Sequence, residues 1–260
     1  MDERTVHSLN AINRSFYGET ADDFDASRSE PWPGWTRLLP LVEQRRTTGA
    51  FQVLDVGCGN GRFGAFLADR LVPGELRYTG VDSSEFLLAR ARARALPFAA
   101  VELVCADLVE ARERLPAGPY SLIALFGVLH HIPGLARRRA LLRSLGERLT
   151  PGGLLVLTCW QFEAFSRFRD KLIPWQDYNR TARDPIDVEQ LEPGDHLLPW
   201  GDSDPAVRYC HFTSEDDIRQ LLSDLSFDLV SSYAADGREG NLNRYFICRF
   251  RNTQEVPKKG

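Results

Sequence analysis

The strongest constraint in the sequence is a glycine-rich turn that follows a short apolar run. The run at residues 51–56 reads FQVLDV, and residues 57–61 read GCGNG. A continuous apolar run of this length is typical of a strand that is buried on both faces. Glycines placed directly after it let the main chain turn tightly and approach a ligand closely. The turn therefore predicts an α/β fold with a ligand site at the end of its first strand.

The chain after this turn alternates between strand-like and helix-like patterns. Such alternation indicates a parallel sheet that is covered by helices on both faces. Apolar runs predict further strands at residues 76–81, 100–106, 120–126, 154–160, 227–235 and 243–250. Helices are expected between them, including two that begin near Ser83 or Ser84 and near Thr213 or Ser214, which are good N-caps. We expect a Rossmann-like, doubly wound sheet of seven strands, mostly parallel with an antiparallel last strand, plus an N-terminal helical cap.

The same patterns predict one domain over residues 1–260 with four parts. Two prolines and a glycine interrupt the helical N-terminal segment near residue 31, and residues 160–210 break the strand–helix rhythm. The expected parts are a helical cap at 1–45, a cofactor-binding core at 46–159, an insertion or lid at 160–210 and the C-terminal part of the sheet at 211–250.

Composition excludes several classes of protein. The net charge is −4, which argues against a broad basic surface, and the arginine clusters at 90–94 and 137–139 read as solvated helix faces. The five cysteines are dispersed without a CxxC pair, so we expect no disulfide framework and no metal site. The N-terminus is polar and no apolar run is long enough to span a bilayer, so a cytoplasmic protein without membrane contact is expected.

Two cofactors are compatible with the glycine turn by itself. Residues 59–64 read GNGRFG, and Asp82 follows 18 residues after Gly64, as in a dinucleotide-binding fingerprint. An NAD(P) enzyme is therefore one reading. Asp55 favours another, because a carboxylate directly before the turn is unhelpful beside a pyrophosphate but suits a cationic ligand.

Besides the glycine turn, four further segments favour a cationic ligand over a dinucleotide, because their order and spacing agree with one known pattern. DVGCGNG, GVDSS, CADL, LFGVLHHIP and LTPGGLLVL, within residues 45–160, resemble the motifs of class I S-adenosylmethionine-dependent methyltransferases with a type 11/12 methyltransferase domain. The resemblance implies a methyltransferase that binds S-adenosyl-L-methionine and releases S-adenosyl-L-homocysteine. Within these motifs it implies that the cofactor contacts Asp55, Gly57, Cys58, Gly59, Gly61, Asp82, Ser83, Asp107, Leu108, Phe126 and Gly127.

The outer segments resemble a narrower family, which methylates the carboxymethyl group of wobble uridine in tRNA. The resemblance is carried by the PWP element at residues 31–33, by GDHLLPW at 194–200 and by RYCHF at 208–212, where Cys210 replaces an expected aromatic residue. It implies that Tyr17 and Arg28 hold the methionine end of the cofactor, and that Arg208 and His211 face the methyl acceptor.

Three functions stay open at this point. The first is O-methylation of the carboxymethyl group of tRNA, and the second is methylation of a small carboxylate, hydroxyl or amine compound. The third is an inactive partner subunit that binds the cofactor only. His131 follows the fourth strand and is a candidate base, which a carboxylate acceptor does not require because it is already ionised at neutral pH. The acceptor, the methylated atom, the use of a base, the oligomeric state and the need for a partner subunit are not given by the sequence.

Overall fold

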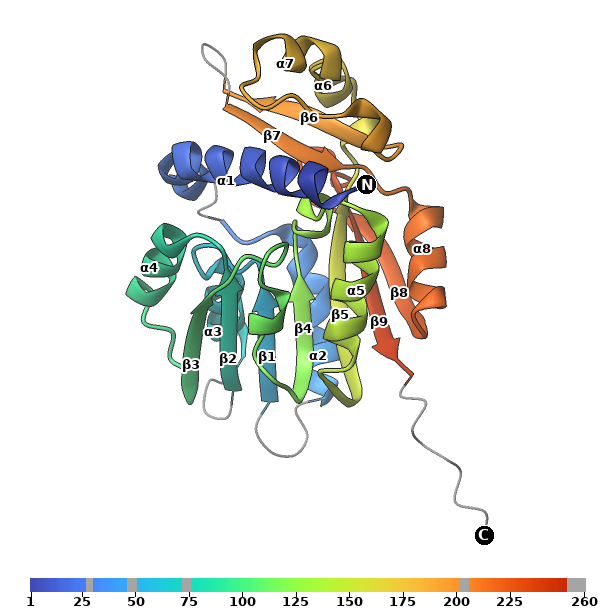
Figure 1. Cartoon of the computed structure of the whole chain (residues 1–260). Helices are drawn as coiled ribbons and strands as arrows, with labels where there is room; N and C mark the ends of the chain where they lie inside the picture. The colour runs from blue at the N-terminus through green and yellow to red at the C-terminus, as the bar shows by residue number, and fades with distance from the viewer. Residues whose placement is uncertain (27–29, 46–50, 72–75, 202–205, 252–260) are drawn as a thin grey trace.

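A seven-stranded sheet forms the centre of the computed structural model, which describes residues 1–26, 30–45, 51–71, 76–201 and 206–251 (Figure 1). The strand order is β3-β2-β1-β4-β5-β9-β8. The strands are β1 (Phe51–Val56), β2 (Leu76–Asp82), β3 (Ala100–Cys105), β4 (Tyr120–Leu125), β5 (Leu149–Trp160), β8 (Phe227–Ala235) and β9 (Asn243–Phe250).

Strands β1 to β5 are parallel to one another, whereas β9 pairs antiparallel with both β5 and β8. The predicted sheet of seven mostly parallel strands with an antiparallel last strand is therefore confirmed. The chain order reverses between β1 and β4, which are neighbours in the sheet. In open α/β sheets a reversal of this kind leaves a crevice at the carboxyl ends of the strands, where ligands bind.

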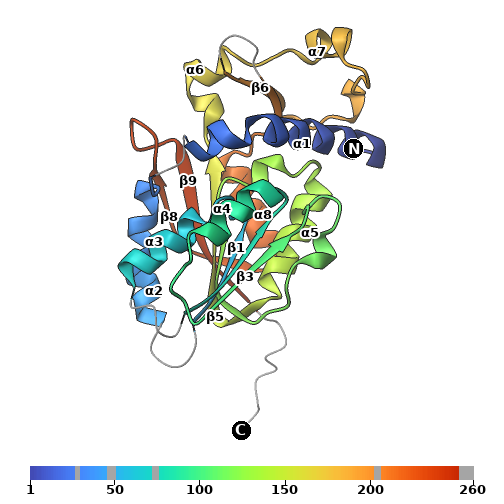
Figure 2. The same cartoon turned by 90° about the vertical axis from the view of Figure 1, so that its left-hand side faces the viewer.

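Helices cover both faces of the sheet, and each face has its own apolar core (Figure 2). One core packs η1, α2 and α3 against the strands, and the other packs α5 and α8. The elements that flank the sheet are η1 (Pro33–Leu38), α2 (Leu39–Arg45), α3 (Arg62–Arg70), α4 (Glu85–Ala93), η3 (Arg112–Arg114), η4 (Leu129–His131), α5 (Leu135–Gly146) and α8 (Glu215–Asp224).

Two of these helices begin at the serines expected from the sequence. The Ser84 hydroxyl accepts a hydrogen bond from the Leu87 amide, and the Ser214 hydroxyl accepts one from the Asp217 amide. Each bond satisfies an amide that has no partner within the first turn of the helix. The alternative caps, Ser83 and Thr213, lie one residue earlier in the chain.

The start of β5 differs from the prediction. The Thr-Pro-Gly-Gly segment was expected to precede a strand at 154–160, but β5 already begins at Leu149. Its register against β4 jumps from Tyr120–Leu149 to Leu122–Leu154, so the extra residues form an irregularity within the strand. Gly152 accommodates this turn with a φ of 76°. Sequence pattern missed it because a proline and a glycine normally end a strand.

A long helix and a small second sheet lie above the carboxyl ends of the main strands. Figures 1 and 2 both place α1 (Glu3–Ala26) between the main sheet and the small one. The small sheet pairs β6 (Asp195–Trp200) antiparallel with β7 (Ala206–His211). The elements beside it are η5 (Phe162–Ala164), α6 (Ser166–Arg169), α7 (Trp175–Thr181) and η6 (Val188–Gln190), and we call η5 to β7 the lid. No helix in the described ranges is long and apolar enough to cross a membrane.

Candidate active site

A cavity of about 590 Å³ lies where the carboxyl ends of β1, β2 and β4 meet α1 and the lid. Its walls combine residues that are far apart in the sequence, from Asn10 on α1 to Asn243 on β9. Of the residues predicted to bind cofactor or acceptor, the following line it: Tyr17, Asp55, Gly57, Cys58, Gly59, Asp82, Ser83, Asp107, Leu108, Phe126, Gly127, His131 and Arg208. Most of the residues expected at the site thus share one cavity.

The glycine turn forms the floor of this cavity beside Asp82. Gly57, Gly59 and Gly61 all have positive φ values, of 75°, 52° and 74°. A Cβ added to Gly57 would lie 2.2 Å from the Val128 side chain, whereas one added to Gly59 would meet nothing within 4 Å. Backbone at Gly59 is therefore open to a ligand, and the turn fits a molecule that lies close along the main chain.

Asp82 ends β2 and points its carboxylate across the turn. Its Oδ2 accepts from the Gly59 amide at 2.8 Å and its Oδ1 from the Ser84 amide at 2.9 Å. Burial raises the pKa of Asp82, and these amides oppose the shift by stabilising the charged form. Each carboxylate oxygen can accept a second hydrogen bond, so Asp82 can still bind a pair of ribose hydroxyls.

Asp55 is buried beneath the same turn with only 2% of its surface exposed. Burial raises its pKa to about 7, nearby Asp82 adds to the shift, and a 2.6 Å hydrogen bond from the Tyr78 hydroxyl opposes it. A cationic ligand group nearby would favour the ionised form. The electrostatics of this end of the cavity therefore suit the positively charged methionine end of S-adenosylmethionine.

Asp107 follows β3 and is held by both the main chain and α1. Its Oδ1 accepts from the Val109 amide at 2.9 Å, and its Oδ2 accepts from Asn10 Nδ2 at 2.8 Å. Leu108 lines the cavity beside it. This arrangement gives a polar group and an apolar surface at one point, as recognition of an adenine ring requires.

Aromatic rings form the wall after β4. Phe126 contacts Trp32, Trp35 and Phe63 with ring centroids 4.9–6.3 Å apart. Trp35 is buried, and its Nε1 has no hydrogen-bond partner among the residues that the structure describes. Trp32 and Trp35 therefore contribute both to the core and to the cavity wall.

His131 lies in η4 and is held by hydrogen bonds on both ring nitrogens. The Tyr209 carbonyl lies 3.1 Å from Nδ1, and because a carbonyl only accepts, this contact requires a proton on Nδ1, whereas the longer 3.4 Å contact with Asn13 Nδ2 does not. In the neutral ring Nε2 then accepts from the Tyr17 hydroxyl, 2.8 Å away. Any proton transfer at Nε2 would first have to displace Tyr17, so the geometry favours an orienting role over that of a base.

Arg208 extends from β7 into the cavity wall with 5% of its surface exposed. Its guanidinium carbon lies 4.7 Å from the ring centroid of Trp160 and 5.3 Å from those of Phe16 and Trp200. Arg208 Nε is buried and has no hydrogen-bond partner among the described residues. Aromatic faces stabilise the charge, but they leave the Nε donor without a hydrogen bond.

Two predicted site residues are not found at the cavity, and a third lies outside the part of the chain that the structure describes. His211 does not line it, because its side chain turns away to Asp195, whose Oδ1 lies 2.7 Å from His211 Nδ1. Gly61 instead starts α3 in a left-handed conformation, and an added Cβ would lie 3.0 Å from the Ala91 Cβ. Arg28 lies outside the described residues.

Other residues at the cavity were not singled out from the sequence. Asn10 and Asn13 share one face of α1 with Tyr17, and this polar stripe of helical spacing was the available signal. Asp236 accepts hydrogen bonds from the Gly34 amide and the Tyr245 hydroxyl, and so joins the PWPGW segment to the turn between β8 and β9. No sequence pattern pairs residues about two hundred positions apart.

Two groups of side chains lie close enough together to share a metal ion. They are His130, His131 and Cys210 beside the cavity, and Glu192, Asp195 and His211 in the lid. The hydrogen bonds described for His131 and His211 already engage these nitrogens. The expectation that the chain uses no metal stays a prediction.

Comparison with known proteins identifies the class of enzyme. Residues 54–155 match a family model described as a methyltransferase domain. A protein of Encephalitozoon cuniculi named as a methyltransferase is 28% identical over 231 residues, covering 88% of this chain and 90% of its own. The tRNA (carboxymethyluridine(34)-5-O)-methyltransferase of Saccharomyces cerevisiae is 28% identical over 61% of this chain, which spans 54% of that protein.

Solved structures agree with the fold. The 1,6-didemethyltoxoflavin-N1-methyltransferase of Burkholderia thailandensis superimposes with a TM-score of 0.62 at 17% identity, covering 95% of this chain and 91% of that one. The sheet therefore has the Rossmann-like fold of that structure. Residues 54–155 form a methyltransferase domain, the predicted S-adenosylmethionine-dependent methyltransferase is confirmed, and the dinucleotide reading of GNGRFG is dropped.

Proposed function

We propose that this enzyme transfers the methyl group of S-adenosylmethionine to a carboxylate oxygen, and that its acceptor is the carboxymethyl group of a wobble uridine in tRNA. The observation that carries the proposal is Arg208, a buried guanidinium in the cavity wall whose Nε has no partner among the described residues. The cofactor's place is proposed along Gly57, Gly59, Asp82 and Asp107, which share that cavity.

A buried arginine side chain is stabilised by an anion that binds to it. Desolvation of a charged group is costly unless hydrogen bonds and an opposite charge compensate for it. The rings of Phe16, Trp160 and Trp200 supply only part of that compensation. A carboxylate matches the planar fork of a guanidinium and can accept two hydrogen bonds from it.

The chemistry is simple for such an acceptor. When bound, the cofactor supplies a methyl group on a positively charged sulfur. A carboxylate oxygen forms a bond to the methyl carbon as the carbon–sulfur bond breaks with its electron pair going to sulfur, giving a methyl ester and S-adenosylhomocysteine. No proton moves, so Arg208 has to orient the acceptor while the aromatic rings exclude water.

Two observations support tRNA as the carrier of the carboxylate. The PWP, GDHLLPW and RYCHF segments, which resemble the wobble-uridine methyltransferases, meet at this cavity through Trp32, Trp200 and Arg208. Trp160 and Phe168 line the same wall, and faces of this kind stack on an unpaired base. A pyrimidine with a short carboxylate arm could therefore use the aromatic wall and Arg208 together.

The test is transfer of a radiolabelled methyl group to tRNA that carries 5-carboxymethyluridine at position 34. Base treatment should release the label as methanol, because a methyl ester is base-labile and a methylated amine or base is not. Arg208→Ala should lower kcat/KM for this tRNA at least a hundredfold and change the dissociation constant of S-adenosylhomocysteine less than twofold, since loss of a desolvated charge pair costs about 3–5 kcal/mol. Arg139→Ala is the control, because Arg139 pairs with Asp224 and lies outside the cavity lining.

Other outcomes would select the alternatives. Full activity of Arg208→Ala, or label that resists base, would contradict carboxylate methylation and favour a small hydroxyl or amine acceptor. Tight binding of the cofactor without turnover of the tRNA, of simple carboxylates or of amines would favour an inactive partner subunit.

A further inference from the structure

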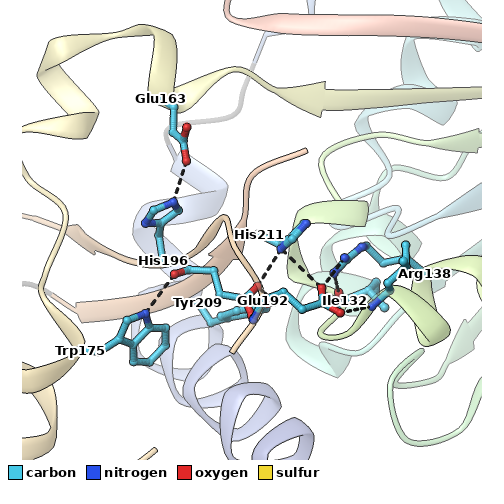
Figure 3. A network of polar contacts seen from close by, with 10 residues as sticks. Ile132, Arg138, Glu163, Trp175, Glu192, His196, Tyr209 and His211 are labelled. Atoms are coloured by element: carbon cyan, nitrogen blue, oxygen red, sulfur yellow. Dashed lines mark hydrogen bonds and ion pairs between the residues drawn. The ribbon is translucent and has the colours of Figure 1, made fainter. Parts of the chain in front are cut away.

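Among the described residues of the lid, Asp195 is a carboxylate that accepts three hydrogen bonds, and it lies outside the cavity lining. Its side chain is fully buried. Oδ1 accepts from the Tyr209 hydroxyl and from His211 Nδ1, both at 2.7 Å, and Oδ2 accepts from the Glu192 amide at 2.7 Å. Figure 3 shows Tyr209, His211 and Glu192 lying close to one another. One carboxylate thus gathers three donors from different parts of the lid.

The residue that Asp195 holds is the next one after Arg208. Tyr209 is fixed at three points, because its amide also donates to Asn13 Oδ1 at 2.9 Å and its carbonyl accepts from His131 Nδ1. Successive side chains of a strand point to opposite faces, so a fixed Tyr209 sets the direction in which Arg208 leaves β7. Asp195 is therefore linked to the orientation of Arg208 through Tyr209, although it does not contact Arg208.

The same carboxylate is connected to the core of the protein. Glu192 Oε2 lies 2.6 Å from Arg138 Nη2, and Arg138 Nη1 donates to the Ile132 carbonyl at 3.1 Å. Arg138 belongs to α5 and is 3% exposed, so the expectation that it lies on a solvated helix face is wrong. Ile132 lines the cavity directly after His131. This network, visible in Figure 3, fixes the lid relative to the cavity wall.

We infer that Asp195 is a positioning residue, which holds Arg208 in the geometry that binds the acceptor carboxylate. The inference rests on the proposed function. The inference assigns a role to the GDHLLPW segment that neither its packing nor the family match supplies. Asp195 of that segment positions Arg208 of the RYCHF segment. Register in the small sheet agrees, since Asp195 faces His211 and Leu198 faces Arg208.

Asp195→Asn is the variant that separates positioning from simple stabilisation. An amide has one acceptor oxygen and one donor nitrogen, so it cannot satisfy three donors, and its nitrogen must oppose one of them. Trp175→Phe is the matched control, because Trp175 Nε1 donates to the main-chain carbonyl of Asp195 rather than to its carboxylate. Both variants remove one hydrogen bond at Asp195, but only the first alters the carboxylate that holds Tyr209.

The kinetic arm uses tRNA with 5-carboxymethyluridine at position 34. Asp195→Asn should raise its KM at least tenfold and leave the dissociation constant of S-adenosylhomocysteine within twofold, whereas Trp175→Phe should change neither by more than twofold. Because Asp195 acts through Arg208, adding Asp195→Asn to Arg208→Ala should cost less than a further twofold in kcat/KM. Full additivity of the two losses would overturn the inference.

A second experiment uses NMR and requires no methyl acceptor. The Nε–H resonance of Arg208 in a ¹⁵N spectrum can be assigned by its loss in Arg208→Lys. It should shift or broaden in Asp195→Asn and stay in place in Trp175→Phe. An unchanged resonance in Asp195→Asn would overturn the inference even if the tRNA is a substrate, and a changed one would support it even if carboxylates prove not to be the acceptors.

Discussion

Asp55 is expected to make the ligand-free protein less stable as the pH rises. Its pKa in the folded protein is raised to about 7 by burial, against an ordinary value of 3.8 for an exposed aspartate. Between these two values the unfolded chain has released a proton that the folded chain still binds. Stability therefore falls with each pH unit, and the loss is complete once the pH passes the folded pKa.

The magnitude follows from the width of that window. Each pH unit corresponds to about 1.4 kcal/mol, so the two units from pH 5 to pH 7 correspond to about 3 kcal/mol from this one group. In Asp55→Asn the amide is neutral at every pH, and its oxygen can still accept the hydrogen bond from Tyr78. The variant should therefore gain about 3 kcal/mol over the wild type between pH 5 and pH 7, which is roughly 6–12 °C in Tm for a chain of this size.

Differential scanning calorimetry at constant ionic strength measures this difference. Asp69→Asn is the control, because Asp69 is exposed on α3 and its variant should melt in parallel with the wild type. Parallel pH profiles for Asp55→Asn and wild type would refute the reasoning. The same variant should bind S-adenosylhomocysteine more weakly, because the neutral amide cannot form an ion pair with the ammonium group of the ligand. A carboxylate that lowers stability but binds the ligand is a trade-off between stability and function.

Three further substitutions test other parts of the site and the fold. Asp82→Ala should weaken binding of S-adenosylmethionine at least tenfold in calorimetric titration, and a smaller loss would count against its role at the ribose. Gly57→Ala should lower Tm well below that of Gly240→Ala, because both glycines have φ values above 70° but only the Cβ at Gly57 meets a neighbour, at 2.2 Å; equal melting temperatures would show that the contact relaxes freely. Ser214→Ala should lower the free energy of unfolding in urea by about 1 kcal/mol through loss of the helix cap, with cofactor affinity unchanged.

The proposed cofactor half of the site could be predicted from sequence because its determinants are local. Asp55, Asp82 and Asp107 each stand at the end of a parallel strand, and the carboxyl ends of such strands meet at one edge of the sheet. Strand pattern and glycine spacing therefore placed these side chains without knowledge of distant contacts. The same reasoning narrowed the caps to Ser83 or Ser84 and to Thr213 or Ser214, since a cap bonds within its own first turn.

The acceptor half depended on contacts between distant parts of the chain. Sequence alone determined that Arg208 and His211 lie in one short polar segment, and it assigned both to the acceptor. Only the tertiary structure separated them, because the pairing of β6 with β7 directs His211 toward Asp195 while Arg208 enters the cavity among rings from α1, β5 and β6. Which face of a strand meets a cavity is decided by what packs above it, and that information lies in residues nearly two hundred positions away.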